Sequence, residues 1–402
     1  MYKRNYSRYS RGRNNRNRRA NIRTFDPSSV IAAMKESQSR AGGFNGINST
    51  SPIFDDHVVK NKFSDFPLDW KLAKNIESRG YPAPTPIQDQ AIPKIMSGID
   101  VAGVANTGTG KTAAFLIPLI NKVILNRRSR VLIITPTREL AVQIDKELQM
   151  FSKGLGIQSA VCIGGISIKG QIFKLQRRPN FVIGTPGRLL DLENQRKIYF
   201  DEFKSIVLDE VDRMLDMGFI KDMEHIISKL PKNRQSLFFS ATLDEKTISV
   251  MSSFISNPVI ISVKSRDTRP NVHQEIVKIG GRNKADVLYE ILDKREVEKS
   301  LVFVRTKRGA DSLSRKLYSI GFKTAVIHGN RSQNQRQKSL DQFKLGEVNV
   351  LVATDVASRG IDVRDITHVI NFDLPGTYED YVHRIGRTGR VDNNGIALSF
   401  IG

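Results

Sequence analysis

A glycine-rich segment offers the clearest chemistry in this chain. Residues 105–112 read ANTGTGKT, after the apolar run DVAGV and before the helical pattern TAAFLIPLINKVIL. Glycines let backbone N–H groups turn towards phosphate oxygens, and the amino terminus of the next helix adds its positive dipole end. Lys111 supplies a charge to the β- and γ-phosphates, and the Thr112 hydroxyl can join the shell of a Mg²⁺ ion. The pattern predicts a nucleoside-triphosphate site formed by Ala105, Asn106, Thr107, Gly108, Thr109, Gly110, Lys111 and Thr112.

Two acidic residues, Asp209 and Glu210, end the apolar stretch FKSIVL and open the string DEVD. Ligands of an open parallel sheet bind at the carboxyl ends of its strands, so these side chains are predicted to face the phosphates. Asp209 would hold Mg²⁺, partly through water, because Mg²⁺ keeps much of its hydration shell. Glu210 would act as the base that orients and activates the attacking water. The alternative, two solvated acids that cap the next helix, is disfavoured by their place after a wholly apolar strand.

The elements that must position these residues alternate between apolar β-branched runs and helical patterns. That alternation is typical of βαβ units around buried parallel sheets, and it predicts an α/β fold with helices flanking each sheet. Seven runs precede the polar segment KSRDTR: DVAGVA, VLIITP, SAVCIGG, FVIGTP, SIVLDE, SLFFSAT and VIISV. Five follow it: SLVFVRT, TAVIHG, VNVLVATD, HVINFD and IALSFI. We therefore expect a tail over 1–60, domains over 61–263 and 271–402, and a linker over 264–270.

The charge of the chain points to a polyanionic partner. The formal net charge is +22, and residues 1–25 carry nine basic side chains with no acidic one. Tyr2, Tyr6 and Tyr9 are interleaved with them, and Arg and Tyr can both stack on exposed bases. The composition predicts a disordered tail that binds nucleic acid without reading its sequence. A transit peptide or a nuclear address fits the same composition.

Several classes of protein are disfavoured. No run approaches the roughly 18 apolar residues of a membrane span, and no apolar stretch follows the basic amino terminus as a secretory signal requires. The single cysteine, Cys162, lies in the apolar run SAVCIGG, where a buried strand residue is expected rather than a reactive thiol. We expect a soluble protein of a reducing, cytoplasmic compartment, without a membrane partner.

Seven strings occur in an order and at a spacing that resemble those of the DEAD-box RNA helicases. They are ANTGTGKT, PTREL, TPGR, DEVD, SAT, VATDVASRGID and HRIGRTGR. The resemblance covers roughly residues 63–402. It implies two RecA-like domains, ATP and Mg²⁺ as cofactors, and hydrolysis stimulated by RNA.

The resemblance also implies roles at the nucleotide. In GYPAPTPIQ, Gln88 resembles the residue that reads the adenine edge, and Phe63 resembles the aromatic residue that stacks on the ring. Asp362 resembles the residue that binds the ribose hydroxyls. Arg387 and Arg390 resemble arginine fingers, which reach the γ-phosphate only when the domains close.

Further roles implied by the resemblance concern coupling and RNA. The relay between the hydrolysis site and the domain interface would use Ser240, Thr242, Asp212 and His383, although turn-capping also explains Ser240 and Thr242. Contacts to the RNA backbone would come from Arg138, Gly165, Thr185, Arg188, Arg305, Gln333, Arg336 and Thr354. Such contacts fix register without reading sequence, and contacts to 2′-hydroxyls distinguish RNA from DNA. The helix opened by TPGRLLDL would bend the strand, so that a short duplex separates locally.

One departure from the family pattern is Val211, which stands where the family's namesake string has alanine. Its side chain is expected to pack away from phosphate. The function predicted first is an ATP-dependent RNA helicase that opens short duplexes or remodels RNA–protein complexes. An ATP-gated RNA clamp or ribonucleoprotein scaffold, with little unwinding, uses the same residues and stays open as an alternative. A DNA motor is disfavoured by the motif set.

Overall fold

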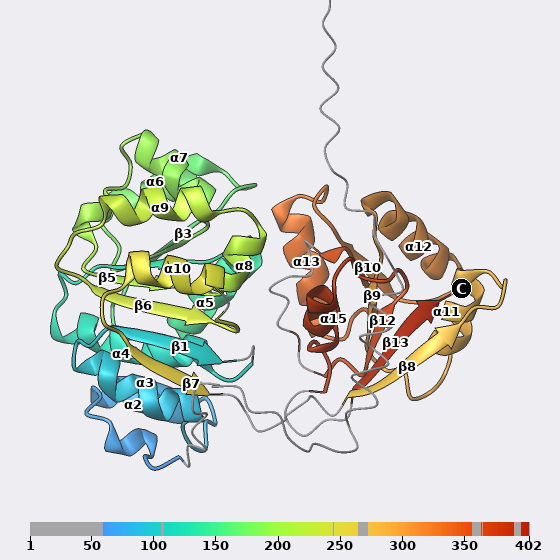
Figure 1. Ribbon diagram of the computed structural model, residues 1–402, viewed down its shortest axis with the longest axis horizontal. Coiled ribbons are helices and arrows are strands. Elements are labelled where there is room, and N and C mark those ends of the chain that lie inside the picture. Colours follow the sequence, from blue (N-terminus) through green and yellow to red (C-terminus); the bar gives the residue numbers. More distant parts are fainter. Residues whose placement is uncertain are drawn as a thin grey trace, which may run out of the picture.

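The computed structural model describes residues 59–105, 108–243, 245–263, 272–355, 363, 365–389 and 395–401. It contains two parallel sheets, each flanked by helices, that lie side by side (Figure 1). This arrangement confirms the predicted fold class. The predicted tail as far as residue 58 and the predicted linker lie outside the described residues.

The first sheet is entirely parallel and has the strand order β3-β4-β2-β5-β6-β1-β7. Its strands coincide with the seven predicted apolar runs: β1 Val101–Ala105, β2 Val131–Ile134, β3 Ser159–Cys162, β4 Phe181–Gly184, β5 Ser205–Leu208, β6 Gln235–Ser240 and β7 Val259–Val263. Alternate residues of these strands enter separate cores on the two faces, so that Ile133 packs on one face and Leu132 on the other. Burial on both faces explains why the strands are apolar throughout.

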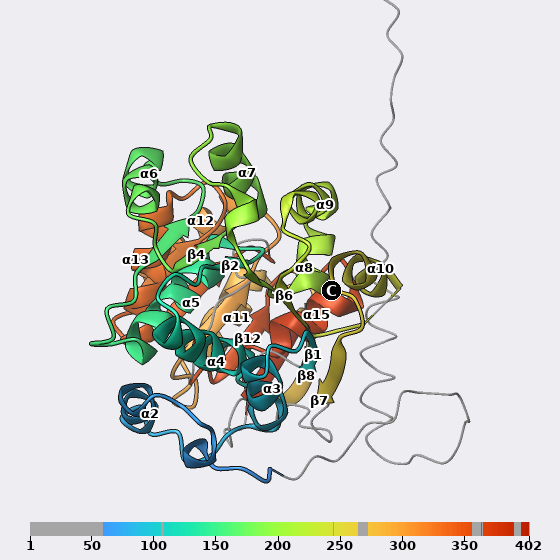
Figure 2. The ribbon, with the colours of Figure 1, turned by 90° about the vertical axis from the view of Figure 1, so that its left-hand side faces the viewer.

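Helices cover both faces of this sheet (Figure 2). The face with Ile133 packs against α2 Trp70–Glu77, α3 Pro86–Met96, α4 Lys111–Leu125 and α5 Arg138–Phe151. The opposite face packs against α6 Ile168–Gln176, α7 Pro186–Asn194, α8 Val211–Asp216, α9 Ile220–Lys229 and α10 Glu245–Phe254. Short 3₁₀ helices span Phe63–Asp65 (η2) and Phe200–Glu202 (η3).

The second sheet has the order β10-β11-β9-β12-β13-β8, again with parallel neighbours. Its strands are β8 Val272–Lys278, β9 Ser300–Phe303, β10 Thr324–Ile327, β11 Val350–Ala353, β12 His368–Asn371 and β13 Gly395–Ile401. Its described helices are α11 Lys284–Leu292, α12 Lys307–Ser319, α13 Gln333–Lys344 and α15 Tyr378–Ile385. The predicted strands are confirmed, but β8 was not predicted from the sequence.

Two sequence expectations about buried side chains are confirmed. Val211 is fully buried in the core beneath α8, so its extra volume relative to alanine is accommodated by packing. Cys162 is fully buried at the end of β3, and burial raises the pKa of its thiol to about 12. Among the described residues, no helix is long and apolar enough to cross a membrane.

Candidate active site and nucleic-acid interface

The glycine-rich loop joins the carboxyl end of β1 to the amino terminus of α4. Gly108 and Gly110 have φ values of 84° and 92°, a left-handed conformation that glycine adopts without steric cost. Lys111 is buried, and its Nζ atom donates to the backbone carbonyl of Ala105 over 2.6 Å. Thr112 is half-buried in the first turn of α4, while Asn106 and Thr107 lie outside the described residues. The described part of the loop thus has the glycine conformations and the lysine that a phosphate cradle needs.

Gln88 lies directly beside this loop and is fully buried. Its Oε1 accepts the backbone N–H of Thr85 over 2.9 Å, and its Nε2 donates to the carbonyl of Gly110 over 3.1 Å. The amide therefore holds the phosphate loop in addition to the predicted adenine contact, for which one N–H and one lone pair remain. Phe63 is half-buried and packs edge-on against Phe66 and Tyr81, with ring centroids 6.2 and 6.1 Å apart.

Asp209 follows β5 at the same edge of the sheet, and it is almost fully buried. One carboxylate oxygen accepts the backbone N–H of Glu210 over 3.0 Å. Burial raises the pKa of Asp209 to about 7, against the opposing charge of Lys111. A buried carboxylate whose pKa is raised by desolvation is stabilised in its ionised form by a nearby cation, which fits the predicted Mg²⁺ position. Among the described residues no cluster of three or more His, Cys, Asp or Glu could hold a metal alone, so phosphate and water would complete its shell.

Glu210 is held by an ion pair within its own helical turn. Its Oε2 lies 2.5 Å from Nη1 of Arg213, and the Arg213 side chain is itself buried. Burial acts to raise the pKa of Glu210, but the charges of Arg213, Lys111 and Arg387 outweigh it and lower the pKa below its usual range. The backbone of Glu210 is left-handed, with φ 52°, which costs a non-glycine residue about 1 kcal/mol. The lowered pKa keeps the carboxylate ionised, in the form that can accept a proton, and the ion pair with Arg213 fixes its position.

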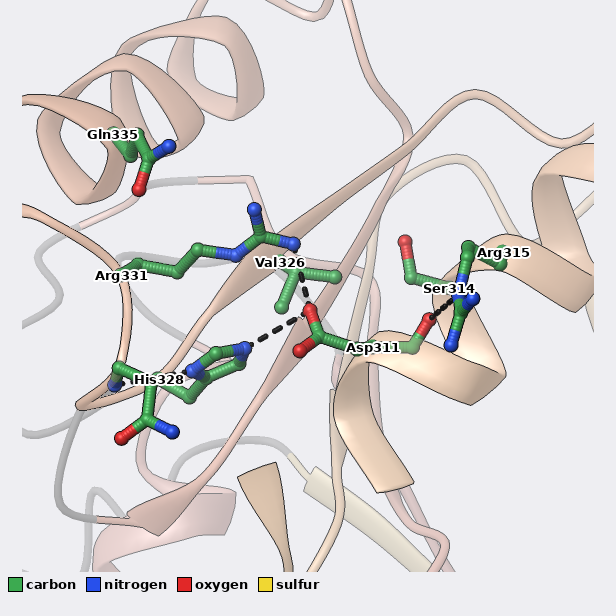
Figure 3. A pocket seen from close by; sticks show the side chains of 8 residues that line it. Asp311, Ser314, Arg315, Val326, His328, Arg331 and Gln335 are labelled. Atoms are coloured by element: carbon green, nitrogen blue, oxygen red, sulfur yellow. Dashed lines mark hydrogen bonds and ion pairs between the residues drawn. The ribbon is translucent and has the colours of Figure 1, made fainter. Parts of the chain in front are cut away.

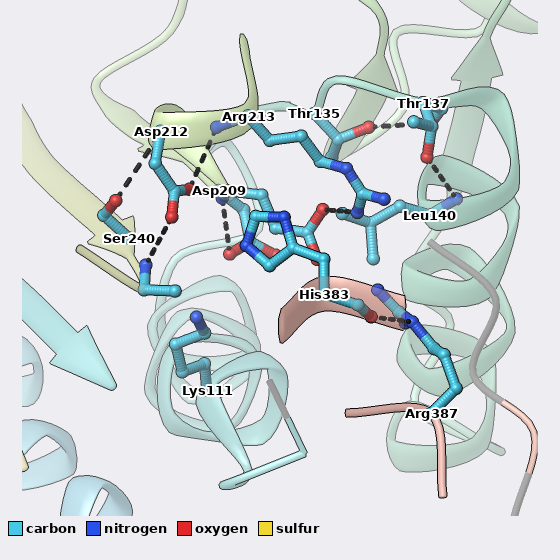
Figure 4. Close-up of polar contacts among 12 residues, drawn as sticks. Lys111, Thr135, Thr137, Leu140, Asp209, Asp212, Arg213, Ser240, His383 and Arg387 are labelled. Carbon is cyan, nitrogen blue, oxygen red and sulfur yellow. Dashed lines mark hydrogen bonds and ion pairs between the residues drawn. The ribbon is translucent and has the colours of Figure 1, made fainter. Parts of the chain in front are cut away.

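The second sheet contributes side chains to this region from α15 and the turn after it (Figure 4). Arg387 is buried, its Nε donates to the backbone carbonyl of His383 over 3.3 Å, and its charge acts on Glu210. Figure 4 shows the His383 imidazole directed towards the acidic residues that follow β5. Arg390 and Asp362 lie outside the described residues.

A hydrogen-bonded connection links the acidic string to the end of β6. Asp212 Oδ2 accepts the backbone N–H of Ala241 over 3.1 Å, and the backbone N–H of Asp212 donates to Oγ of Ser240 over 3.4 Å. Ser240 is fully buried, whereas Thr242 lies exposed in the loop beyond it. The structure thus joins Asp212 to Ser240 but leaves Thr242 outside this connection.

A second group of predicted residues gathers at the opposite half of the same sheet edge, after β2, β3 and β4. Arg138 begins α5, and its guanidinium occupies the space beside Gly165, where a Cβ atom would approach Nη1 of Arg138. Burial, together with the positive charges of Arg336 and Arg188, lowers the pKa of Arg138. Thr185 is the N-cap residue of α7, the helix that contains Arg188. Three arginines therefore converge on this part of the sheet edge, although Asp191 pairs with Arg188 and Glu139 pairs with Arg336. Such a cluster of guanidinium groups is suited to binding phosphate.

The second sheet meets this group through the first turn of α13. Nε2 of Gln333 donates to Oε1 of Glu139 over 2.9 Å, and Nη2 of Arg336 lies 3.1 Å from the same oxygen. Three buried atoms here have no hydrogen-bond partner among the described residues: Arg188 Nη1, Arg336 Nε and Gln333 Oε1. Two are donors and one is an acceptor, which matches the phosphate and 2′-hydroxyl groups of an RNA backbone.

Comparison with protein families identifies the family to which this chain belongs. Residues 85–250 match the DEAD/DEAH box helicase family, and residues 283–392 match the helicase conserved C-terminal domain. The chain belongs to the DEAD-box helicases. Relatives include the ATP-dependent RNA helicase CshA of Listeria monocytogenes, 44% identical over 85% of this chain and 66% of its own length, and CshA of Limosilactobacillus reuteri, 43% identical over 85% and 69%. The chain thus spans about two thirds of the length of these curated relatives.

Solved helicase structures share both sheets. Dbp5 of S. cerevisiae bound to RNA and ADP BeF3 is 29% identical, with a TM-score of 0.73 over 85% of this chain and 89% of that one. Mss116p bound to ssRNA and AMP-PNP is 29% identical, with a TM-score of 0.76 over 87% of this chain and 76% of that one. The RecA-like domain pair implied by the sequence motifs is therefore confirmed.

Two predicted RNA residues of the helicase lie further along the edge of the second sheet. Thr354 is buried after β11, where its backbone N–H donates to the carbonyl of Ile327 over 3.3 Å. Arg305 is exposed after β9, and its backbone N–H donates to Asp373 over 2.9 Å. Because β10, β11 and β9 are parallel neighbours, these positions and the start of α13 share one edge.

Sequence reasoning missed three residues that the helicase uses to hold its site together. Glu139 lies within PTREL and Arg213 lies just after DEVD, so both were inside or beside recognised strings without an assigned partner. Arg384 is buried and forms a bidentate ion pair with Asp355, with Nε to Oδ1 at 2.6 Å and Nη2 to Oδ2 at 2.7 Å. A buried arginine needs such a partner, but nothing in the spacing identifies which acid supplies it.

Proposed function

We propose that the chain hydrolyses ATP in response to RNA and uses the cycle to open short RNA duplexes or to remodel RNA–protein complexes. Family membership supports this proposal, and so does one structural relationship. The two sheet edges approach each other at two places: the charge of Arg387 acts on Glu210, and Glu139 contacts Gln333 and Arg336. A ligand that draws these edges together at one place therefore acts on the other.

In the nucleotide half, the loop from Gly108 to Lys111 would cradle the phosphates, with Gln88 and Phe63 at the adenine. Asp209 and Thr112 would hold Mg²⁺, which neutralises charge on the phosphate oxygens. Glu210 would accept a proton from the attacking water, and Arg387 would stabilise the negative charge that develops on the γ-phosphoryl group. Asp362 would bind the ribose hydroxyls, and Arg390 would act as a second arginine finger. These two roles rest on the sequence motifs alone.

In the RNA half, Arg138, Arg188 and Arg336 would bind backbone phosphates, and Oε1 of Gln333 would accept a hydrogen bond from a 2′-hydroxyl group. Gly165 leaves room for the Arg138 guanidinium beside the strand, and α7, whose N-cap position is Thr185, would bend the strand. Thr354 and Arg305 would extend the contacts along the second sheet. A bent strand cannot remain paired, so a duplex separates without long translocation.

The coupling we propose runs through Asp212 and Ser240, because these residues connect the acidic string to the end of β6. His383 would complete it from the second sheet, and Thr242 would join only after a movement of its loop. A cytoplasmic location is part of the proposal, because ATP and RNA are both available there.

The deciding experiment measures ATP hydrolysis by the full chain with no nucleic acid, with single-stranded RNA and with DNA of the same sequence. Stimulation by RNA and not by DNA is expected, together with strand separation of a short RNA duplex in the presence of ATP. Long-lived RNA binding without strand separation would establish the clamp instead. Equal stimulation by DNA would contradict the assignment to RNA.

A further inference from the structure

A hollow of about 500 Å³ lies on the second sheet, beside the first turn of α13 (Figure 3). Helix α12 contributes Asp311 and Arg315 to its wall, and the segment after β10 contributes His328, Asn330 and Arg331. We call this hollow the Arg331 pocket. Most of its lining is polar, so it does not resemble a groove for an apolar peptide.

The charges in the Arg331 pocket favour an anion. Nη2 of Arg331 donates to Oδ1 of Asp311 over 2.6 Å, so one arginine is balanced by one carboxylate. Arg315 has no such balance within the wall, because its Nε donates only to the backbone carbonyl of Asp311 over 3.3 Å. Lys307 adds another positive charge at the rim, where its Nζ donates to Oδ1 of Asn330 over 2.9 Å. The cations at the pocket therefore outnumber its one carboxylate.

One buried nitrogen in the pocket wall, Nε of Arg331, lacks a hydrogen-bond partner among the described residues. The His328 side chain is only 2% exposed, and its Nδ1 accepts the backbone N–H of Asn330 over 3.2 Å. A neutral imidazole therefore carries its proton on Nε2, which makes that atom a donor. Nε2 lies 3.0 Å from Oδ1 of Asp311, so the Asp311 carboxylate is its partner, and Asp311 is shared between His328 and Arg331 (Figure 3). Nε of Arg331 is thus a donor with unused capacity, and a buried unused donor is costly unless a ligand accepts from it.

The position of the pocket identifies the anion. The segment that carries His328 and Arg331 runs directly into α13, whose first turn holds Gln333 and Arg336. On the other side, α12 begins two residues after Arg305. The bond between Lys307 and Asn330 joins these two segments at the rim. The pocket therefore opens between two groups of residues assigned to the RNA backbone.

We propose that the Arg331 pocket binds a backbone phosphate of the RNA strand, next to the segment held by Gln333, Arg336 and Arg305. Arg331, through its unpartnered Nε, and Arg315 bind the phosphate oxygens, while His328 and Asp311 hold the wall of the pocket in place. Asp311 is a positioning residue, which holds the Arg331 guanidinium over the hollow. The inference rests on the proposed function, because it lengthens the RNA path on the second sheet.

The test measures the affinity of the full chain for single-stranded RNA with a non-hydrolysable ATP analogue, using oligonucleotides lengthened one residue at a time. In the wild type, affinity should rise in a step at the length that reaches the pocket. Arg331→Ala should remove that step, lowering affinity for the longer RNA about three- to tenfold and the salt slope by about 0.7, the value for one phosphate contact on a single strand. Affinity for the shortest RNA should stay the same.

Two further variants keep the test decisive. Arg315→Gln leaves the Asp311–Arg331 pair intact, so it reports on the pocket even if Arg331→Ala folds poorly. Lys316→Ala removes one exposed charge from the same helix outside the pocket and serves as the matched control. Equal losses of RNA affinity in the control and in the pocket variants would overturn the proposal. It would also be overturned if RNA affinity were independent of Arg331 and Arg315 at every length. That second result is the one expected for a pocket that binds free phosphate or nucleotide instead. A wild type that binds no RNA would contradict the proposed function, whereas wild-type binding without the step contradicts only this inference.

Discussion

Glu139 of the first sheet accepts a hydrogen bond from Gln333 of the second, over 2.9 Å, and the same carboxylate oxygen lies 3.1 Å from Arg336. Glu139 is buried, and a buried carboxylate needs partners, two of which come from the opposite sheet. One carboxylate therefore organises both the domain contact and the predicted RNA surface around Arg138.

Separating the effects of Glu139 and Arg336 tests that relationship. Glu139→Gln and Arg336→Gln should each lower the RNA-stimulated ATPase about tenfold, because each leaves a buried polar group unpaired at the domain contact. The double variant should be less impaired than the sum of the two, with a coupling energy of about 1 kcal/mol or more. The measurement is the ATPase rate at increasing RNA for all four proteins. Strict additivity would show that the pair does not act as a unit.

Replacing the proposed base should stop turnover and leave binding. Glu210→Gln removes the proton acceptor but keeps the side-chain shape, so ATP hydrolysis should fall about 10²–10⁴-fold. Affinity for ATP and for RNA should remain near that of the wild type, measured by fluorescence titration of each ligand. Near-normal hydrolysis in this variant would rule out Glu210 as the base.

Arg213 should set the acid limb of the ATPase pH profile. The charge of Arg213 opposes the effect of burial and lowers the pKa of Glu210. In Arg213→Met that positive charge is lost, so the pKa of Glu210 should rise. The acid limb of the kcat profile should then move to higher pH, and turnover at neutral pH should fall about tenfold. Arg213→Lys keeps the charge and should show a smaller displacement. An unchanged profile in Arg213→Met would mean that the ion pair does not control the base.

The raised pKa of Asp209 predicts how stability depends on pH and Mg²⁺. Burial raises this pKa from 3.8 to about 7, so the unliganded fold loses stability as pH rises through that range, where the unfolded chain is ionised and the folded carboxyl is not. Mg²⁺ binds the ionised form. The gain in Tm from Mg²⁺ with a non-hydrolysable ATP analogue should therefore be larger above pH 7 than below it, by roughly 2 °C or more. Asp209→Asn should show no such difference, and a wild-type gain independent of pH would argue against Asp209 as the metal residue.

The basic amino-terminal segment should contribute to RNA binding through charge. Deleting residues 1–24 removes all nine of its lysines and arginines. RNA affinity should fall, and its salt slope should weaken by about 0.7 for each phosphate that the segment binds in the wild type. ATPase at saturating RNA should survive, because the segment contributes nothing to the catalytic strings. An unchanged salt slope would show that this segment does not bind RNA.

The strands of the fold were predictable because most are buried on both faces. Apolar runs such as VLII and FVIG have no solvent-facing positions, so the sequence marks them clearly. Strand β8 escaped prediction because it lies at an edge, where half-buried Val272 and Gln274 alternate with exposed His273 and Glu275. An edge strand needs no continuous apolar run, and its pairing with β13 depends on a segment far away in the sequence.

The candidate site was predictable to the extent that its residues lie at strand ends within recognisable strings. Parallel strands bring these ends to one edge, which is why Asp209, Ser240 and the glycine-rich loop meet. Partners were not predictable, because a carboxylate such as Glu139 or Asp355 can be paired only once the helices around it are placed. The Arg331 pocket depends in the same way on the packing of α12 against β10, which no local pattern encodes.

The contact between Gln88 and Gly110 has a consequence for nucleotide selectivity. A Cβ atom at position 110 would come within 2.4 Å of Nε2 of Gln88, so the residue proposed to contact adenine and the loop proposed to hold the phosphates are packed against each other. Base preference therefore cannot be exchanged by a single substitution at position 88, since any new side chain there also reshapes the loop. If Gln88 selects adenine as proposed, a change to another nucleotide would require both positions to change together, so that this selectivity would resist stepwise mutation.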